Sequence, residues 1–279
     1  MTSLGKRILT TVVAVPTLFS TIFFLPYNHY LALSFLAMIT VVLASMELKT
    51  LYTKAEGIKI HLPAWTTAFL PLAQWLEIAY FPQLPLLDLT VVILSLTFFA
   101  TELSVGQHDD FSKTLSRIGG ASLIIIYPGL LITFIVRLIS LPHTSAFLIL
   151  FFLLVFGNDV FAFLFGMSFG KNNKGIIKVS PNKSLAGFIG GTLSTILLSV
   201  LFIYFVPGIK DELTIVQAVL LGLLTSISAN IGDLIESAFK RSAKVKDSGN
   251  IIPGRGGLLD SIDSLLASAP VYWLLLTLF

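Results

Sequence analysis

Long apolar runs are the feature of this sequence that most limits its fold. They lie at about residues 8–26, 30–46, 62–81, 84–101, 118–139, 145–168, 187–207, 215–236 and 264–279. Because a helix needs roughly 20 apolar residues to cross a hydrocarbon core about 30 Å thick, these runs predict an all-α, polytopic integral membrane protein with about nine transmembrane helices. A composition of 55% hydrophobic and 12% charged residues excludes an ordinary soluble domain.

Two weaker runs and the N-terminus affect the number of spans. The last run is short and the second is marginal, so eight spans are expected if one of them lies in the interface or re-enters the membrane. Lys6 and Arg7, followed by apolar residues, also have the shape of a signal peptide. A first transmembrane helix is favoured, because no small-residue cleavage pattern follows and further spans come directly after it.

The basic residues predict the orientation. If the N-terminus is cytoplasmic and the spans alternate, sixteen of the 18 Lys and Arg residues face inward and only Arg137 and Lys210 face outward. This positive-inside bias supports nine spans in the cytoplasmic membrane, with the C-terminus outside. It also accounts for the net charge of +3 without a nucleic-acid partner, since no basic face with interleaved aromatic residues is present.

We expect two regions, transmembrane helices at 1–140 and a catalytic transmembrane region at 141–279. Two predicted cytoplasmic loops in the second region, at about 171–186 and 237–263, hold nine of the sixteen inward-facing basic residues and most clusters of Gly, Ser, Pro and Asn. Gly187 and Gly191, four residues apart at the start of a span, indicate close helix packing rather than ligand binding. Any chemistry is therefore expected in the two loops.

Acidic residues in or near the spans are candidates for a polar site, because a charge at the centre of a span costs about 2.5–3.5 kcal/mol and usually faces a cavity. Asp159 lies in the sixth run. Asn230, Asp233 and Glu236 follow at three-residue intervals in the eighth and share one helix face. This stripe fits a metal or ion site and a hydrogen-bond network between packed helices about equally well. Glu77 is interpreted as interfacial.

A glycine-rich segment at 253–257 precedes the last run. Gly254, Gly256 and Gly257 can adopt positive φ and direct consecutive N–H groups at an anion such as phosphate. Asp260 and Asp263 follow three residues apart on one helix face. Carboxylates beside a phosphate site indicate Mg²⁺ with a nucleotide polyphosphate. The glycines alone fit better with a turn followed by a helix N-cap.

Both loops also carry basic clusters, at Lys178 and Lys183 and at Lys240, Arg241, Lys244 and Lys246. Each cluster alone is explained by a loop that sets membrane topology. Lysines, a phosphate-binding loop and carboxylates on one face are, however, the usual equipment of phosphoryl and nucleotidyl transfer.

Several motifs together closely resemble the signature of phosphatidate cytidylyltransferases, also called CDP-diacylglycerol synthases. The matching blocks are Gly232-Asp233-Leu234-Ile235-Glu236-Ser237, Lys240-Arg241, Val245-Lys246-Asp247-Ser248-Gly249, Pro253-Gly254-Arg255-Gly256-Gly257 and Leu259-Asp260-Ser261-Ile262-Asp263-Ser264. Asn158-Asp159, and Ser180-Pro181-Asn182-Lys183-Ser184 with Gly187 and Gly190-Gly191, are similar to two further blocks. The resemblance covers about residues 150–275.

The resemblance implies that a phosphatidate oxygen attacks the α-phosphorus of CTP, giving CDP-diacylglycerol and pyrophosphate for phospholipid biosynthesis. The implied cofactor is Mg²⁺, with room for a second cation. Because the nucleophile is already an anion at neutral pH, no side-chain base is required, and catalysis can rest on positioning and charge neutralisation. The expected partners are CTP, phosphatidate and the lipid bilayer, with no nucleic acid, and a homodimer is an expected assembly.

The resemblance also implies roles for individual residues. The catalytic residues would be Asp233, Lys240, Arg241, Lys246 and Asp260. Substrate contacts would come from Asn158, Ser180, Lys183, Ser184, Asp247, Ser248, Gly254, Arg255, Gly256 and Gly257. The metal ligands would be Asp159, Asp233, Asp260 and Asp263.

Three positions depart from the family pattern. Arg255 stands where the family usually has His, Ser261 where it has Arg, and Ala186 where it has Glu. A catalytically weakened relative is therefore one alternative, and a related CTP-dependent lipid kinase, which transfers the γ-phosphoryl group, is another. An ion-coupled secondary transporter is less favoured because the sequence has no internal repeat. The D-G-x-x-A-R motif of CDP-alcohol phosphotransferases is absent.

Overall fold

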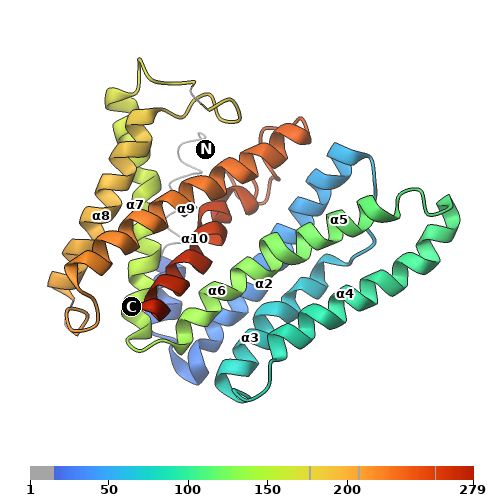
Figure 1. Ribbon diagram of the computed structural model, residues 1–279, viewed down its shortest axis with the longest axis horizontal. Coiled ribbons are helices and arrows are strands. Elements are labelled where there is room, and N and C mark those ends of the chain that lie inside the picture. The colour runs from blue at the N-terminus through green and yellow to red at the C-terminus, as the bar shows by residue number, and fades with distance from the viewer. Residues whose placement is uncertain (1–15, 176, 207, 255) are drawn as a thin grey trace. The chain divides into compact units, whose positions relative to one another are not determined.

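The computed structural model describes residues 16–175, 177–206, 208–254 and 256–279. All regular elements in these ranges are helices (Figure 1). Two isolated antiparallel bridges, Lys174 with Ser184 and Ile252 with Gly256, close loops between helices. The structure therefore confirms the predicted all-α class, and its long apolar helices confirm a polytopic membrane protein.

The helices form two units. Residues of the first unit fall within Met1–Ile139 and Phe239–Ser261. Its elements are α2 (Tyr27–Glu56), η1 (Ala64–Ala68), α3 (Phe69–Ala79), α4 (Leu86–Val105), η2 (Gly106–Asp109), α5 (Thr114–Ile124), η3 (Ile125–Leu130) and α6 (Leu131–Arg137), followed by η4 (Leu138–Ser140). Helix α2 packs against α3, α5 and α6. Segment η3 is a π-helical turn at Pro128, which cannot supply the usual backbone hydrogen bond.

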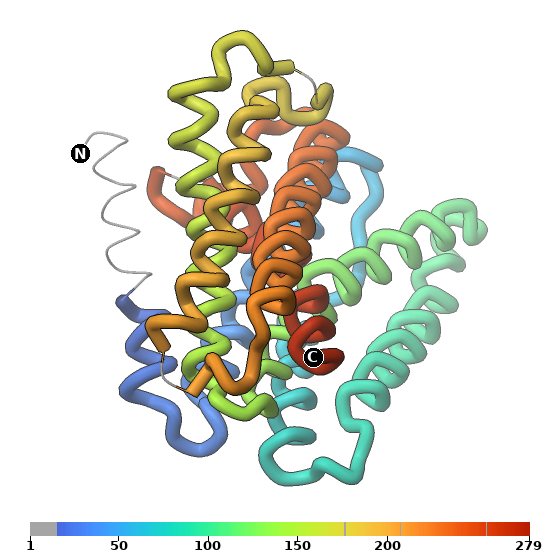
Figure 2. Tube along the Cα trace, turned by 60° about the vertical axis from the view of Figure 1, so that its left-hand side comes forward, coloured from blue at the N-terminus to red at the C-terminus, as the bar shows by residue number. Residues whose placement is uncertain are grey.

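The second unit falls within Ser140–Ala238 and Ile262–Phe279. It contains α7 (Thr144–Phe169), α8 (Leu185–Phe205) and most of α9 (Ile215–Ser242) and α10 (Leu259–Leu278). Helices α7 and α8 run side by side (Figure 2). The fully buried Tyr272 hydroxyl of α10 donates a hydrogen bond to the Phe147 carbonyl of α7 at 2.8 Å. The functional division into transmembrane helices at 1–140 and a catalytic region at 141–279 stays a prediction.

Seven helices in the described residues are long and apolar enough to cross a membrane. They correspond to seven of the nine predicted runs, so the count of about nine is not confirmed. Much of the first run lies outside the described residues. The third run forms η1 and α3, of 5 and 11 residues, together shorter than the roughly 20 residues of a full span. The second and last runs, expected to be the weakest, form helices of 30 and 20 residues.

Arg117, one of the basic residues assigned to the cytoplasmic side, is buried. Its guanidinium group pairs with Glu102 and Asp109, both at 2.6 Å. This ion pair joins α5 to α4 and η2. Because two carboxylates compensate the buried charge, Arg117 contributes to packing in the first unit.

Glycines bring helices of the second unit into close contact, as predicted for Gly187 and Gly191. A Cβ atom at Gly187 would lie 2.7 Å from the Ala162 carbonyl oxygen, and one at Gly191 would lie 3.0 Å from the Ala162 Cβ atom. Both contacts join α8 to α7. The prediction of close helix packing at these glycines is confirmed.

Gly222 provides a direct test of such packing. A Cβ atom there would lie 2.7 Å from the Ile196 Cα atom and 2.9 Å from the Thr195 carbonyl oxygen, both on the backbone of α8. Gly222→Ala is expected to destabilise the protein by about 1–3 kcal/mol through overpacking, measured as a lower thermal midpoint in detergent. Gly119→Ala is the matched control, because nothing lies within 4 Å of its added Cβ atom. Equal midpoints for the two variants would contradict the proposed contact.

Candidate active site

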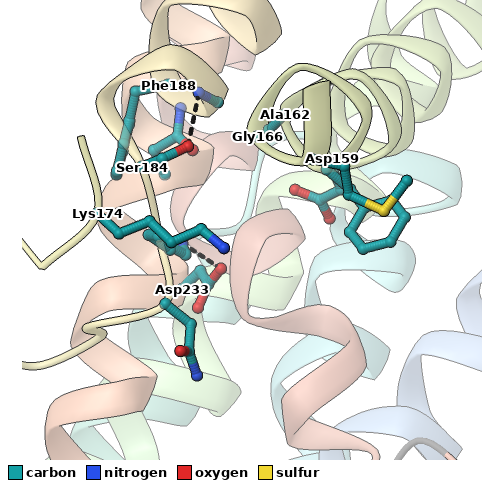
Figure 3. Close-up of a pocket in the computed structure, with 13 residues that line it drawn as sticks. Asp159, Ala162, Gly166, Lys174, Ser184, Phe188 and Asp233 are labelled. Atoms are coloured by element: carbon teal, nitrogen blue, oxygen red, sulfur yellow. Dashed lines mark hydrogen bonds and ion pairs between the residues drawn. The ribbon is translucent and has the colours of Figure 1, made fainter. Parts of the chain in front are cut away.

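A polar pocket of about 560 Å³ opens in the second unit between α7, α8, α9 and the loop that joins α7 to α8 (Figure 3). Two carboxylates, Asp159 and Asp233, and two ammonium groups, Lys174 and Lys183, line it. Figure 3 shows the Asp159 carboxylate and the Lys174 ammonium group directed into the pocket. The pocket therefore offers charges of both signs at the ends of apolar helices.

Lys183 and Asp233 form an ion pair in this pocket. Their side chains keep 25% and 33% of their surface exposed, so both remain accessible to a ligand. The Ser237 hydroxyl donates a hydrogen bond to the Asp233 carboxylate at 3.4 Å, and the Lys183 ammonium group lies 5.5 Å from the centre of the Phe188 ring. Asp233 lies on α9 and Lys183 lies in the loop between α7 and α8.

Local hydrogen bonds hold the loop over the pocket. The Asn173 backbone carbonyl accepts from the Leu185 N–H group at 3.1 Å, and the Ser184 hydroxyl oxygen caps α8 by accepting from the Gly187 N–H group at 3.1 Å. A serine at this position is a common helix N-cap. Ser184 thus lines the pocket and also fixes the start of α8, whereas Ser180 is not among the lining residues.

Asn158, which was predicted to contact substrate, lies outside the pocket lining. It is fully buried. Its side-chain oxygen accepts a hydrogen bond from the Ser226 hydroxyl at 2.7 Å, and its amide nitrogen donates to the Asn230 side-chain oxygen at 3.4 Å. Thr195 adds a contact from α8. Asn158 therefore links α7, α8 and α9, which is the hydrogen-bond network considered for the Asn230 stripe.

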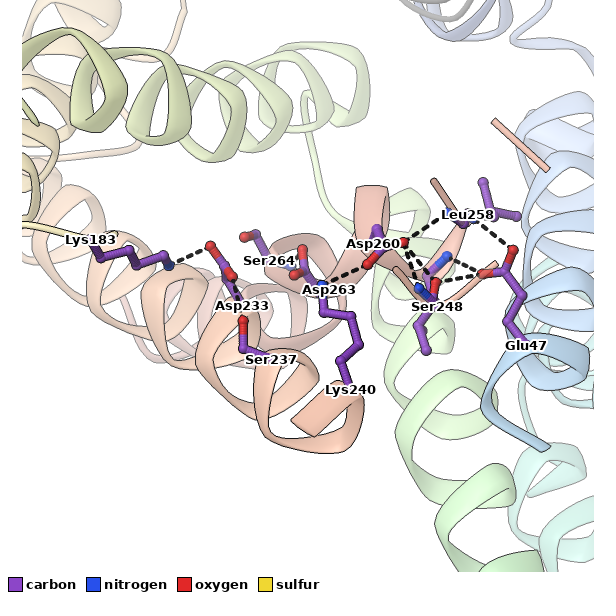
Figure 4. Close-up of polar contacts among 12 residues, drawn as sticks. Glu47, Lys183, Asp233, Ser237, Lys240, Ser248, Leu258, Asp260, Asp263 and Ser264 are labelled. Carbon is purple, nitrogen blue, oxygen red and sulfur yellow. Dashed lines mark hydrogen bonds and ion pairs between the residues drawn. The ribbon is translucent and has the colours of Figure 1, made fainter. Parts of the chain in front are cut away.

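The glycine-rich segment lies in the first unit. Figure 4 shows the polar contacts among Ser248, Leu258, Asp260 and Glu47 of the same unit. Gly254 and Gly256 have φ values of 81° and 108°, which confirms the predicted need for glycine. Ile252 and Gly256 exchange backbone hydrogen bonds of 2.8 and 3.1 Å that close a tight loop. A Cβ atom at Gly256 would lie 2.8 Å from an Asp260 carboxylate oxygen, so the loop follows the carboxylate closely.

Asp260 organises this loop. Its Oδ2 atom accepts hydrogen bonds from the Gly257 N–H group at 2.7 Å, the Ser248 N–H group at 2.9 Å and the Ser248 hydroxyl at 3.0 Å. Its Oδ1 atom accepts from the Lys240 ammonium group at 2.6 Å. In this state Asp260 acts as a helix cap and ion-pair partner, which agrees with the N-cap alternative for the glycine segment.

Glu47 of α2 completes the same cluster, although the sequence analysis did not identify it. The side chain is buried, and its Oε1 and Oε2 atoms accept from the Leu258 and Leu259 N–H groups at 2.9 and 2.8 Å. Oε2 also accepts from the Ser248 hydroxyl at 3.0 Å. A carboxylate at the start of a helix is favoured by the helix dipole. Glu47 thus holds the loop and the start of α10.

Other predicted site residues divide by environment. Arg241, Lys246 and Asp247 are exposed, whereas Ser248 and Asp263 are buried. The Asp263 carboxylate accepts from the Ser264 N–H group at 2.6 Å. The predicted contact from Arg255 lies outside the described residues.

The acidic residues of the pocket fit a magnesium ion. In the described part of the chain, no three His, Asp or Glu side chains are grouped as a metal centre made only of protein ligands would require. Mg²⁺ is commonly held by one or two carboxylates together with water and substrate phosphates. Asp159 of α7 and Asp233 of α9 are the two carboxylates of this kind that line the pocket.

Two residues were missing from the predicted site. Lys174 was assigned only a role in membrane topology. In the structure it lines the pocket, and its backbone pairs with that of Ser184 in an antiparallel bridge across the loop. Glu47 directly follows the second apolar run. A charge at the edge of an apolar run is the signal that could have found it.

The fold and the site define a polytopic helical membrane protein with an acidic and basic pocket and a carboxylate-bound glycine loop. A family model described as the cytidylyltransferase family matches residues 5–279. The chain belongs to the cytidylyltransferase family.

Individual relatives agree with this assignment. The chain is 34% identical to the phosphatidate cytidylyltransferase of Bacillus subtilis over 207 residues, 73% of this chain and 69% of that protein. It is 42% identical to the phosphatidate cytidylyltransferase of Haemophilus influenzae over 133 residues, 47% of this chain and 46% of that protein. It is also 36% identical over 251 residues to a protein of Escherichia coli K12 named "Uncharacterized protein YnbB", covering 88% of this chain and 78% of that protein.

Proposed function

We propose that this chain is a phosphatidate cytidylyltransferase that makes CDP-diacylglycerol for phospholipid biosynthesis. A phosphatidate oxygen attacks the α-phosphorus of CTP, a new oxygen–phosphorus bond forms, and the bond to the departing pyrophosphate breaks. The observation that carries the proposal is the match of the whole chain to the cytidylyltransferase family, together with relatives that are named for this activity.

The polar groups supply charge complementarity for such a reaction. Each unit holds a lysine–aspartate pair, Lys183 with Asp233 and Lys240 with Asp260. Substrate phosphates would draw the lysines away from the carboxylates, and the freed carboxylate oxygens would then be available to a cation. Positioned ammonium groups stabilise the charge that develops during transfer. Exposed Arg241 and Lys246 would add contacts to phosphate.

Magnesium is part of the proposal. Asp159 and Asp233 would hold the ion in the pocket of the second unit. The roles of Asp260 and Asp263 as metal ligands stay predictions. The ion would neutralise triphosphate charge and make the α-phosphorus more electrophilic. The protein residues would orient the two substrates and retain the phosphates.

The surroundings of the reaction are also proposed. The active groups would face the cytoplasm in a bacterial cytoplasmic membrane, and phosphatidate would reach them from the inner leaflet. CTP would enter from water. A homodimer stays a prediction.

Asp233 gives the clearest test of the pocket. Asp233→Asn is expected to lower the kcat for CDP-diacylglycerol formation at least about 100-fold, because a carboxylate that would hold the magnesium ion is lost while Lys183 keeps its charge. The KM for CTP should not rise, since a positive charge is unmasked. Asp88→Asn, an exposed residue in the first turn of α4, is the matched control. A raised KM with an unchanged kcat would show that Asp233 contributes only ground-state binding.

A further inference from the structure

A groove of about 740 Å³ on the first unit lies outside the machinery of the proposed reaction. It runs along the second half of α2 and the segment that leads into η1. Its walls include three lysines and three large apolar side chains, Lys49, Lys54, Lys59, Val42, Met46 and Trp65. None of these residues lines the pocket of the second unit or bonds to the glycine loop. The groove is therefore a separate candidate site.

The described residues that line the groove carry net positive charge. Lys54 and Lys59 are exposed, and none of the described residues that line the groove is acidic. The half-buried Lys49 donates a hydrogen bond to the Leu62 carbonyl at 2.8 Å, which fixes the segment after α2 against the helix. Three ammonium groups around one groove favour an anionic ligand.

The apolar wall shows what else that ligand must carry. Met46 and Trp65 expose 51% and 59% of their surfaces. They lie on or beside α2, one of the helices long and apolar enough to span a membrane. Tryptophan is enriched at membrane interfaces, where its ring contacts both headgroups and chains. Inorganic phosphate or a free nucleotide would match the lysines but leave this apolar wall exposed.

We propose that the groove binds one anionic phospholipid, with its phosphate held by Lys49, Lys54 and Lys59. Its acyl chain would follow Val42, Met46 and Trp65 along α2. The groove is at the C-terminal end of α2, which the positive-inside pattern predicts to be on the cytoplasmic side. Anionic lipids of that leaflet attract basic side chains, each worth about fivefold in affinity. The inference depends on membrane insertion and does not depend on the proposed reaction.

Trp65 provides a local probe. The full-length protein would be placed in phosphatidylcholine nanodiscs. Increasing mole fractions of brominated phosphatidylglycerol or, separately, of brominated phosphatidylcholine would then be included. Bromine on the acyl chains quenches the fluorescence of nearby tryptophans. Trp65→Phe identifies the signal of Trp65 among the three tryptophans of the chain. We expect brominated phosphatidylglycerol to quench Trp65 at much lower mole fractions than brominated phosphatidylcholine does.

A matched pair of double variants tests the lysines. Lys54→Gln with Lys59→Gln should reduce the preference for phosphatidylglycerol about 25-fold. Lys113→Gln with Lys171→Gln removes two exposed lysines elsewhere and should leave it unchanged. Equal quenching by both lipids, or equal losses in both double variants, would overturn the proposal. Displacement by soluble glycerol phosphate would also overturn it, because the occupant would then be a free anion.

Discussion

Glu47→Ala is expected to release the glycine loop and to lower activity strongly. The substitution removes the acceptor of the Leu258 and Leu259 N–H groups and one acceptor of the Ser248 hydroxyl. Each buried donor left without a partner costs about 1–3 kcal/mol, so the two backbone groups alone would destabilise the start of α10 by about 2–6 kcal/mol. We expect CDP-diacylglycerol formation to fall at least about 100-fold.

Hydrogen exchange separates this local effect from global unfolding. Peptides that cover residues 248–262 should exchange faster in Glu47→Ala, while peptides from α7 and α8 should keep their protection. Glu47→Gln retains one carbonyl acceptor and should fall between the wild type and alanine. Glu56→Ala, at an exposed residue of the same helix, is the control. Unchanged protection at 248–262 would contradict the role assigned to Glu47.

Asp260→Asn is expected to have a comparable effect on the reaction. An amide cannot both accept the three donors now bound to Oδ2 and pair with the Lys240 ammonium group. We expect product formation to fall about 1,000-fold, in the upper part of the range for a lost electrostatic contact. Asp211→Asn is a matched exposed control. Product formation near the wild-type rate would remove Asp260 from the catalytic group.

An exchanged pair tests whether Asp260 acts through charge pairing alone. Lys240→Asp combined with Asp260→Lys keeps one positive and one negative side chain at these positions, but it removes the carboxylate from the glycine loop. We expect the double variant to remain inactive even where its thermal midpoint approaches that of the wild type. Restored activity would mean that Asp260 and Lys240 serve only as an ion pair.

The positions of most membrane-spanning helices follow from hydropathy. A span must satisfy its backbone hydrogen bonds within the helix, and the side chains that face lipid must be apolar. The run at 145–168 and helix α7 at Thr144–Phe169 agree closely. The run at 62–81 is different. It has the right composition, but it begins as a 3-10 segment after Pro63 and then forms a helix of only 11 residues. Composition does not encode such a break.

Charged residues at span ends show where hydropathy misplaces the end of a helix. The predicted second and fourth runs stop at residues 46 and 101, immediately before Glu47 and Glu102. Both carboxylates are buried within helices that continue past them. Hydropathy counts each charge as a cost, whereas the structure offsets it with backbone N–H groups at Glu47 and with Arg117 at Glu102. These partners lie too far along the chain, up to 212 residues for Glu47, to be recognised by local patterns.

The candidate site residues could be named from the sequence because they lie in short motifs, and their roles stay predictions. Asp233, Lys183 and Asp260 belong to compact motifs, and the glycine loop requires positive φ at fixed positions. The sequence could not distinguish the roles of neighbouring polar residues. Asn158 and Asp159 are adjacent, yet Asn158 is buried in a network between helices and Asp159 lines the pocket. The two side chains differ in environment because they point to different sides of α7.

The fate of the CTP phosphates tests the proposed activity most directly. Purified protein would receive phosphatidate, Mg²⁺ and CTP labelled in separate reactions at the α- or the γ-phosphate. We expect the α-label to enter the lipid and the γ-label to leave as pyrophosphate, and we expect chelator to stop both. Entry of the γ-label into the lipid would instead identify a CTP-dependent kinase, and labelled lipid from neither reaction would contradict the proposed transferase.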